Sequence, residues 1–387
     1  MKAVSGYTLL IFGMLTCLYS VIDSNSAIAA DVTTKAKQAI ILDYDTGTVL
    51  LEKNPDERMP TSSMSKVMTM YLIFDALKKG SLSLEDELLV SEKAWRKGGS
   101  KMFVEVGKTV KVEDLIRGVI IQSGNDATIV LAEGLAGDEV SFAAALNKKA
   151  RELGMKDSHF MNASGWPDPD HYSTARDLAT LAKNMIVNFP QYYGYYAEKE
   201  FTYNKIRQTN RNPLLYKGIG ADGLKTGHTE IGGYGLIGTG QRDGRRVVLV
   251  INGLESSKER SQESARLLQW ALNGFRNVNL FADGAELDKV PVYLGVQNKV
   301  GVHAKQPIHV TVPKLYENDL KIEVSYKSPL KAPIKKGEEI GKVTVTVPDG
   351  EVINVPLVTS SDVAELGFFA KLLAKARLLS TGEGSFL

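Results

Sequence analysis

The chain has 387 residues, a formal net charge of +2 and one cysteine, Cys17. This length is enough for a large core and for two domains. The near-balanced charge excludes the strongly basic surface typical of nucleic-acid binding, so we expect no nucleic-acid partner. A single cysteine excludes an internal disulfide.

Residues 1–29 have the composition of a secretory signal peptide. Lys2 precedes an apolar stretch from Tyr7 to Ile22, and small residues follow at Ala27 and Ala29. This order predicts export and cleavage after Ala29. The alternative is an uncleaved membrane anchor, for which the apolar stretch is only marginally long enough. After cleavage no cysteine remains, which excludes thiolate catalysis and a Cys-ligated metal.

Residues 30–276 are predicted to form an α+β domain. Two strands are expected at 39–45 and 48–54, followed by four helical patterns, two further strands and a last helix. Strands at both ends of the segment suggest one antiparallel sheet flanked by helices. The helical patterns cover 112–122, 125–137, 141–154 and 175–189, the later strands 233–241 and 245–254, and the last helix 261–275.

Residues 277–360 have a different pattern. Apolar and polar residues alternate in short runs separated by Pro, Gly or Asp, which predicts a small all-β domain with a boundary near 275–285. The runs cover 290–296, 308–313, 320–327, 341–348 and 352–358.

Residues 361–387 predict an amphipathic helix too short to span a bilayer. At helical spacing its apolar residues fall on one arc flanked by cations, so we expect it to bind a membrane surface. The alternative is a helix docked on its own protein or on a partner. The arc comprises Phe368, Phe369, Leu372, Leu373, Ala376 and Leu379, and the cations are Lys371, Lys375 and Arg377.

A serine and a lysine are three residues apart at the start of the apolar stretch 60–77. In a helix, Ser63 and Lys66 share one face, and a lysine with a lowered pKa can serve as the base that a serine nucleophile needs. Ser62 is interpreted as a helix cap. Alone, this spacing also fits a capped helix with an exposed lysine.

Two further motifs strengthen the functional interpretation. Ser123-Gly124-Asn125 lies between two helical patterns, and Lys225-Thr226-Gly227 opens a glycine-rich strand. Ser-x-x-Lys, Ser-x-Asn and Lys-Thr-Gly in this order are typical of the penicillin-recognising serine acyltransferases. With the segments 60–69, 117–127, 222–236 and 259–270, the chain resembles the low-molecular-mass D-alanyl-D-alanine carboxypeptidases. The resemblance runs from about Lys37 to the C-terminus.

This resemblance implies a role for each matching residue. Ser63 is the nucleophile, Lys66 accepts its proton, and Ser123, across the cleft, relays a proton to the leaving amine with support from Lys225. The remaining implied contacts are substrate binding by Asn125, carboxylate binding by Thr226 and Arg260, and an oxyanion hole formed by the N–H groups of Ser63 and of His228, after Gly227. Arg260 could instead pair on its helix surface.

The resemblance also implies a fold like that of the serine β-lactamases and transpeptidases, a peptidoglycan pentapeptide substrate and inhibition by β-lactams. The enzyme is expected in the periplasm, peripherally attached to the outer face of the cytoplasmic membrane. We expect no cofactor, and because the five histidines show no metal-binding spacing, we expect no metal. Arg211 and Asp177 also match family positions and are interpreted as scaffolding.

Three other functions remain open from the sequence. A class A β-lactamase deacylates with a glutamate between Ser-x-Asn and Lys-Thr-Gly, but no glutamate occurs between Glu152 and Glu198, and the intervening loop offers only Asp168 and Asp170. A D,D-endopeptidase is not distinguished by the sequence. A catalytically silent wall-binding protein would not require Ser63, Lys66, Ser123 and Lys225 together.

Overall fold

The computed structural model describes residues 32–348 and 350–381, with side chains up to residue 374. The predicted signal peptide lies outside the described residues. The chain divides into two units, residues 31–274 and the segment from Phe275 onward. Each unit is described separately below.

The first unit is built on a five-stranded antiparallel sheet with the order β2-β1-β9-β8-β7. Two strands from the start of the segment join three from its end in one sheet, as expected, but only two of those three, β8 and β9, were predicted as separate strands. The Lys225-Thr226-Gly227 motif lies inside the third, β7, and does not open a strand. The strands are β1 (Gln38–Asp43), β2 (Val49–Lys53), β7 (Ala221–Thr229), β8 (Gly233–Arg242) and β9 (Arg245–Leu254).

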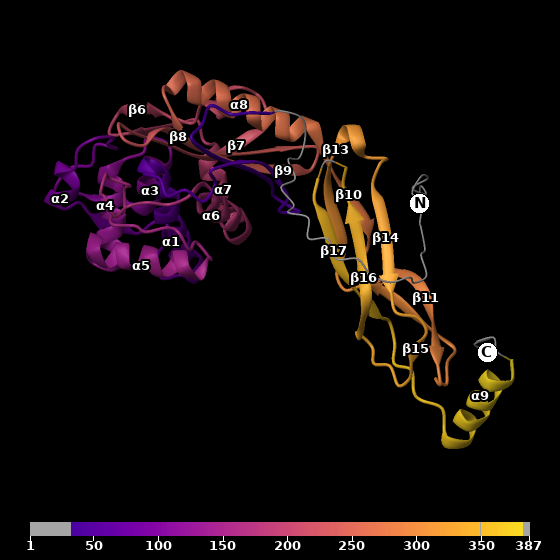
Figure 1. The fold of residues 1–387 in the computed structure, drawn as a ribbon. Coiled ribbons are helices and arrows are strands. Elements are labelled where there is room, and N and C mark those ends of the chain that lie inside the picture. Colours follow the sequence, from indigo (N-terminus) through magenta and orange to yellow (C-terminus); the bar gives the residue numbers. More distant parts are fainter. Residues whose placement is uncertain (1–31, 349, 382–387) are drawn as a thin grey trace. The chain divides into compact units, whose positions relative to one another are not determined.

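Helices cover both faces of this sheet. Helix α8 (Ser257–Gly274) packs on β8 and β9, and α6 (Ala175–Asn188) packs on β1 and β9 from the other side (Figure 1). Strand β9 is therefore buried along nearly its whole length. This explains its almost continuous apolar sequence, which is typical of a strand between two layers.

Helix α1 (Lys66–Lys79) is the centre of the helical layer and is buried on nearly all sides. A helix surrounded in this way has no polar face, so Lys66 cannot reach solvent from it. The helices around it include α3 (Val112–Ile120), α4 (Asn125–Ala136), α5 (Glu139–Glu152) and α6. These match the four helical patterns predicted from the sequence.

Several short elements connect the main layers. They are the helices α2 (Glu92–Arg96) and α7 (Pro190–Tyr193), the 3-10 turns η2 (Gly194–Ala197) and η3 (Pro213–Tyr216), and two antiparallel strand pairs, β3 (Glu87–Leu89) with β4 (Thr109–Lys111) and β5 (Glu200–Tyr203) with β6 (Ile206–Thr209). These strand pairs were not predicted, because strands of three or four residues give too little alternation to recognise.

The described residues of the second unit are all-β, as the alternating pattern predicts, apart from one 3-10 turn and the C-terminal helix. It contains a two-stranded sheet, β10-β13, and a six-stranded sheet in the order β14-β16-β17-β12-β11-β15, around a core rich in valine. The elements are β10 (Phe275–Phe281), β11 (Glu286–Tyr293), β12 (Lys299–Ala304), β13 (Ile308–Pro313), η4 (Lys314–Tyr316), β14 (Lys321–Tyr326), β15 (Leu330–Lys331), β16 (Glu339–Thr346) and β17 (Val352–Thr359).

Helix α9 (Phe368–Thr381) follows this unit. Phe368 and Phe369 are 75% and 80% exposed, and Leu372 and Leu373 are exposed as well. The first two turns of the predicted apolar arc are therefore exposed. The remaining predicted residues, Lys375, Ala376, Arg377 and Leu379, lie beyond the last described side chain. No helix in the described part of the chain is long and apolar enough to cross a membrane.

Candidate active site

The turn that carries the predicted nucleophile is a 3-10 turn, η1 (Ser62–Ser65), which leads directly into α1. The interpretation of Ser62 as a helix cap is wrong. Its backbone is left-handed, with φ of 50°, and its Oγ donates to Thr229 Oγ1 at 3.1 Å. The hydroxyl is therefore engaged with the sheet and does not bind an N–H group of the helix.

Two glycines allow other segments to approach this turn. A Cβ on Gly165 would lie 1.8 Å from the carbonyl oxygen of Ser62, and one on Gly227 would lie 2.9 Å from that of Thr61. Gly227 belongs to strand β7, and Gly165 to the loop before α6. Any larger side chain at either position would push the turn away from its neighbours.

Lys66 lies at the centre of the site. Its Nζ is 2.9 Å from Ser63 Oγ, 2.7 Å from Asn125 Oδ1 and 2.6 Å from the carbonyl oxygen of Ser164. Its side chain is 0% exposed, and burial, together with the charges of Arg211 and Lys97, lowers its pKa to about 7. At neutral pH a large share of Lys66 is therefore the uncharged amine.

The hydrogen bonds of Lys66 fix the direction of its lone pair. A neutral amine has two N–H groups, and the Asn125 and Ser164 oxygens can only accept. The Asn125 amide is oriented because its Nδ2 donates to the Gly98 carbonyl at 2.9 Å. Two N–H groups thus bind two obligate acceptors, and the lone pair is left facing the Ser63 hydroxyl.

Ser123 is held in a strained conformation before α4. Its φ is 67°, an uncommon value for a residue with a side chain. The side chain is 2% exposed, and its Oγ has no hydrogen-bond partner among the described residues. Such strain and an unsatisfied hydroxyl each cost about 1–3 kcal/mol, and both are typical of functional sites.

Asp126 anchors this turn to the segment that precedes it. Its carboxylate accepts from the backbone N–H groups of Met102, Phe103 and Val104 at 2.8, 2.9 and 3.3 Å. The negative charge raises the pKa of Lys66 and so opposes part of the effect of burial. Asp126 was not predicted as a site residue, although it directly follows the Ser-x-Asn motif.

Lys225, on β7, contributes a second buried amine. Its Nζ donates to the Thr226 carbonyl at 3.1 Å. Burial, and then the charges of Lys66, Arg211 and Arg260, hold its pKa well below the usual value. Arg211 therefore acts electrostatically on both lysines and is more than the scaffold that we expected, while its Nη1 donates to Ser100 Oγ at 2.6 Å.

Arg260 belongs to α8, and its side chain contacts β7 and β8. Its guanidinium is 5.5 Å from the centre of the Tyr234 ring, and its Nη1 approaches the Gly227 carbonyl only at 3.4 Å. Its Nε is buried without a partner in the described part of the chain. Burial lowers the pKa of Arg260, which indicates that nearby negative groups do not offset the cost of burying its charge.

The other predicted residues occupy different settings. Thr226 is buried, whereas His228 is exposed and its ring stacks on Tyr234 at 3.9 Å. Asp177 accepts from Ser158 Oγ and from the Asp157 N–H, which is the scaffolding role expected for it. No group of three or more His, Cys, Asp or Glu in the described residues could hold a metal ion.

Together these elements define a serine acyltransferase site, in which a hydroxyl faces a buried uncharged amine and further buried cations lie nearby. The sequence model of the D-alanyl-D-alanine carboxypeptidase family matches residues 24–256, and that of the penicillin-binding protein 5 C-terminal domain matches residues 275–365. The chain belongs to the D-alanyl-D-alanine carboxypeptidase family, and it is a serine-type enzyme of that family.

Individual relatives match most of the chain. The D-alanyl-D-alanine carboxypeptidase DacA of Haemophilus influenzae is 38% identical, with 87% of each chain covered, and DacC of Escherichia coli is 37% identical, with 90% of each covered. The solved structure of penicillin-binding protein 5 from Haemophilus influenzae superposes with a TM-score of 0.78 at 37% identity, covering 87% of this chain and all of the other.

Proposed function

We propose that this enzyme removes the terminal D-alanine from peptidoglycan pentapeptides through an acyl-enzyme on Ser63. The main support for this proposal is the hydrogen bond between Ser63 and Lys66. Lys66 can act as a base at neutral pH because its pKa is lowered to about 7 and its two N–H groups bind the Asn125 and Ser164 oxygens. Ser63 Oγ attacks the penultimate D-alanine carbonyl while Lys66 takes its proton. The Ser63 and His228 N–H groups stabilise the oxyanion.

Collapse of the tetrahedral intermediate requires a proton for the leaving D-alanine amine. Ser123 is the group we assign to this transfer, since its buried hydroxyl has no partner among the described residues. Lys225 supports it electrostatically. Lys66 returns the proton taken from Ser63 to Ser123. Water then attacks the acyl-enzyme and gives a proton to Lys66, which passes it to Ser63 Oγ as the acyl bond breaks. This route needs no metal or cofactor.

The charges around the site favour a substrate that ends in a carboxylate. Lys225, Arg211 and Arg260 each have a lowered pKa, caused first by burial. An anion placed among them would relieve both the desolvation and the mutual repulsion. We assign the terminal carboxylate to Thr226 and Arg260, whose guanidinium fork suits a carboxylate, and the substrate amide to Asn125.

β-Lactams should acylate the same serine. The penicillin-binding protein D2 of Listeria monocytogenes, 30% identical over 62% of this chain, has been solved in an ampicillin-bound form. The only acidic side chains in the loop 161–171 are Asp168 and Asp170, and Asp168 accepts from the Asp170 N–H. We therefore expect slow hydrolysis of the penicilloyl-enzyme, and so inhibition.

The direct test is to incubate the purified protein with a pentapeptide that ends in D-alanyl-D-alanine and to assay free D-alanine. A second sample is labelled with a fluorescent penicillin and digested to locate the adduct. We expect D-alanine release and a label on Ser63. A label elsewhere would refute the nucleophile assignment. Labelling without D-alanine release from pentapeptide or from crosslinked dimers would favour a silent wall-binding role.

The C-terminal helix supports a second, independent proposal. The uncovered Phe368, Phe369, Leu372 and Leu373 suit insertion into the surface of a bilayer. With the predicted signal peptide, this suggests a periplasmic enzyme attached to the outer face of the cytoplasmic membrane. Deleting residues 361–387 should release the protein from vesicles of anionic phospholipid.

A point-variant test avoids the deletion. Replacing Phe368 and Phe369 together by serine should weaken vesicle binding, whereas the matched Val352→Ser, at an exposed apolar position on β17, should not. Binding that survives both the deletion and the double substitution would contradict the proposal and favour a retained N-terminal anchor.

A further inference from the structure

The loop of residues 161–171 supplies one of the three partners of Lys66. The Ser164 carbonyl accepts from Lys66 Nζ, and the preceding carbonyl, of Ala163, accepts from Thr69 Oγ1 at 2.6 Å. Lys66 and Thr69 are one turn apart on α1. Two successive carbonyls of the loop therefore point at one face of the catalytic helix, and their position decides how Lys66 is held.

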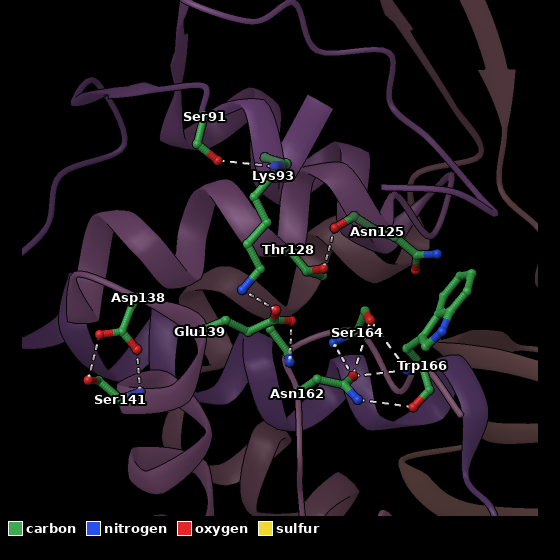
Figure 2. A network of polar contacts seen from close by, with 12 residues as sticks. Ser91, Lys93, Asn125, Thr128, Asp138, Glu139, Ser141, Asn162, Ser164 and Trp166 are labelled. Atoms are coloured by element: carbon green, nitrogen blue, oxygen red, sulfur yellow. Dashed lines mark hydrogen bonds and ion pairs between the residues drawn. The ribbon is translucent and has the colours of Figure 1, made fainter. Parts of the chain in front are cut away.

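Asn162 closes the loop around these carbonyls. Its Oδ1 accepts from the N–H groups of Ser164 and Trp166 at 3.2 and 2.9 Å and from Ser164 Oγ at 3.2 Å, and its Nδ2 donates to the Trp166 carbonyl at 3.0 Å (Figure 2). One side chain thus ties both sides of the bend. Without it, the peptide units at 163–165 would lose their shared anchor.

Two further side chains hold the loop from outside. The Glu139 carboxylate accepts from the Ala163 N–H at 3.2 Å and pairs with Lys93 at 2.8 Å (Figure 2). At the other end, His171 Nε2 lies 2.8 Å from Ser65 Oγ, next to Lys66 in sequence. Ser65 Oγ in turn lies 2.5 Å from Thr61 Oγ1.

The protonation state of His171 follows from its contacts. Its Nδ1 accepts from the Met161 N–H at 3.2 Å, so the ring proton is on Nε2 and is donated to Ser65. The ring is buried against Phe160, and burial lowers its pKa to about 4. At neutral pH His171 is thus a neutral donor that joins the loop to the catalytic turn.

We propose that Asn162 and His171 are positioning residues that, through the Ser164 carbonyl, hold Lys66 with its lone pair toward Ser63. The inference rests on the proposed role of Lys66 as the base. If the loop is released, water replaces the carbonyl and hydrates the amine, which favours the ammonium form. The pKa of Lys66 depends on the charges of Lys97, Asp126 and Arg211. The charge of Lys66 in turn lowers the pKa of His171 and of Lys225.

The test is the rate of acylation by a fluorescent penicillin between pH 5.5 and 10, for the full chain and for Asn162→Ala and His171→Ala. We expect the midpoint of the pH profile to rise by about one unit, which makes acylation roughly tenfold slower below pH 7 and nearly normal at pH 10. His171→Gln should restore the profile, because its amide can accept from Met161 and donate to Ser65.

A matched control lies in the same loop region. His159 Nδ1 contacts the Asp170 carbonyl at 2.7 Å, and among the described residues its side chain has no hydrogen bond to η1 or α1, so His159→Gln should leave the midpoint unchanged. An unchanged midpoint in Asn162→Ala and His171→Ala, whether the rate falls uniformly or not at all, would overturn the proposal. So would an equal shift in His159→Gln.

Should His171→Ala fail to fold, Ser65→Ala removes the same hydrogen bond from the other side with little loss of volume. It should raise the midpoint in the same direction, and no rise would contradict the inference. The proposed function is tested separately, because a wild-type protein that is not acylated on Ser63 would refute it. Normal acylation of the wild type, with an unchanged pH midpoint in the variants, would refute only this inference.

Discussion

The two units of this protein place polar groups in their interiors very differently. Among the described residues from 275 onward, the only buried polar side chains are two threonines, Thr311 and Thr359. The catalytic unit buries Lys66, Lys225 and Asp126, among other polar residues, although buried charge is costly to fold. The comparison teaches that this unit retains unfavourable groups where the chemistry requires them, while the β unit follows the ordinary rules of packing.

Removing the nucleophile should have the largest effect on the catalytic unit. Ser63→Ala should lower D-alanine release and penicillin acylation by at least about 10⁴-fold, because Ser63 supplies the one hydroxyl that is hydrogen-bonded to Lys66 Nζ among the described residues. The measurement is steady-state turnover together with fluorescent labelling. Ser62→Ala, one residue away, loses only its contact with Thr229 and should still be labelled. Substantial turnover by Ser63→Ala would contradict the assignment.

Removing the base should have the next largest effect. Lys66→Met should slow acylation about 10²–10⁴-fold. In the native enzyme, acylation should rise with pH through about 7 as Lys66 loses its proton. A rate that is flat from pH 5.5 to 8.5 would be inconsistent with Lys66 as the base.

The same substitution also tests the cost of burial. The pKa of Lys66 is lowered on folding, so between about pH 7 and its ordinary value of 10.5 the unfolded chain binds more protons. The contribution of Lys66 to the free energy of unfolding should therefore rise with pH across this window. Urea unfolding of native protein and Lys66→Met at pH 7 and 9.5 measures it. A difference between the two proteins that does not change with pH would oppose the prediction.

Arg260 distinguishes recognition from chemistry within the catalytic unit. Arg260→Gln should lower kcat/KM about 10²-fold for a pentapeptide with a free terminal carboxylate, since it removes the guanidinium that we assign to that group. With a C-terminally amidated peptide the loss should be much smaller. Arg266→Gln, on the same helix but paired with Glu263, is the control. Equal losses on both peptides would exclude the carboxylate role.

The β unit should respond to mutation in stability alone. Val302→Ala removes two methyl groups from a fully buried position and should cost about 2 kcal/mol of unfolding free energy. Acylation of the folded protein by penicillin should be unchanged. Calorimetry and a labelling rate measured well below the transition test both statements. A slower acylation rate would show that the two units are coupled in function.

The sequence predicted the regular elements well, because the 3.6-residue and two-residue patterns reflect burial directly. It also placed Ser63 and Lys66 on one face, since three residues in a helical or 3-10 turn bring their side chains together. It did not predict the left-handed backbone of Ser62, which depends on the close approach of β7. Nor did it predict the Ser164 carbonyl, because a backbone group leaves no signature in the choice of side chain.

Arg211 shows a different limit. Its charge acts on Lys66 and Lys225, which lie far from it in sequence, so only the tertiary arrangement reveals the effect. The three motifs were recognisable because each is short and local. The electrostatic field that they share is a property of the folded chain.

The glycines on either side of the Ser62–Ser65 turn also limit how this enzyme can escape its inhibitors. No side chain fits at Gly165 or Gly227 without displacing the nucleophile. Heritable resistance that preserves turnover must therefore arise at positions with room to vary, such as Trp166, which is 42% exposed and packs against Gly98 and Gly99. Saturation mutagenesis under drug selection should leave both glycines untouched.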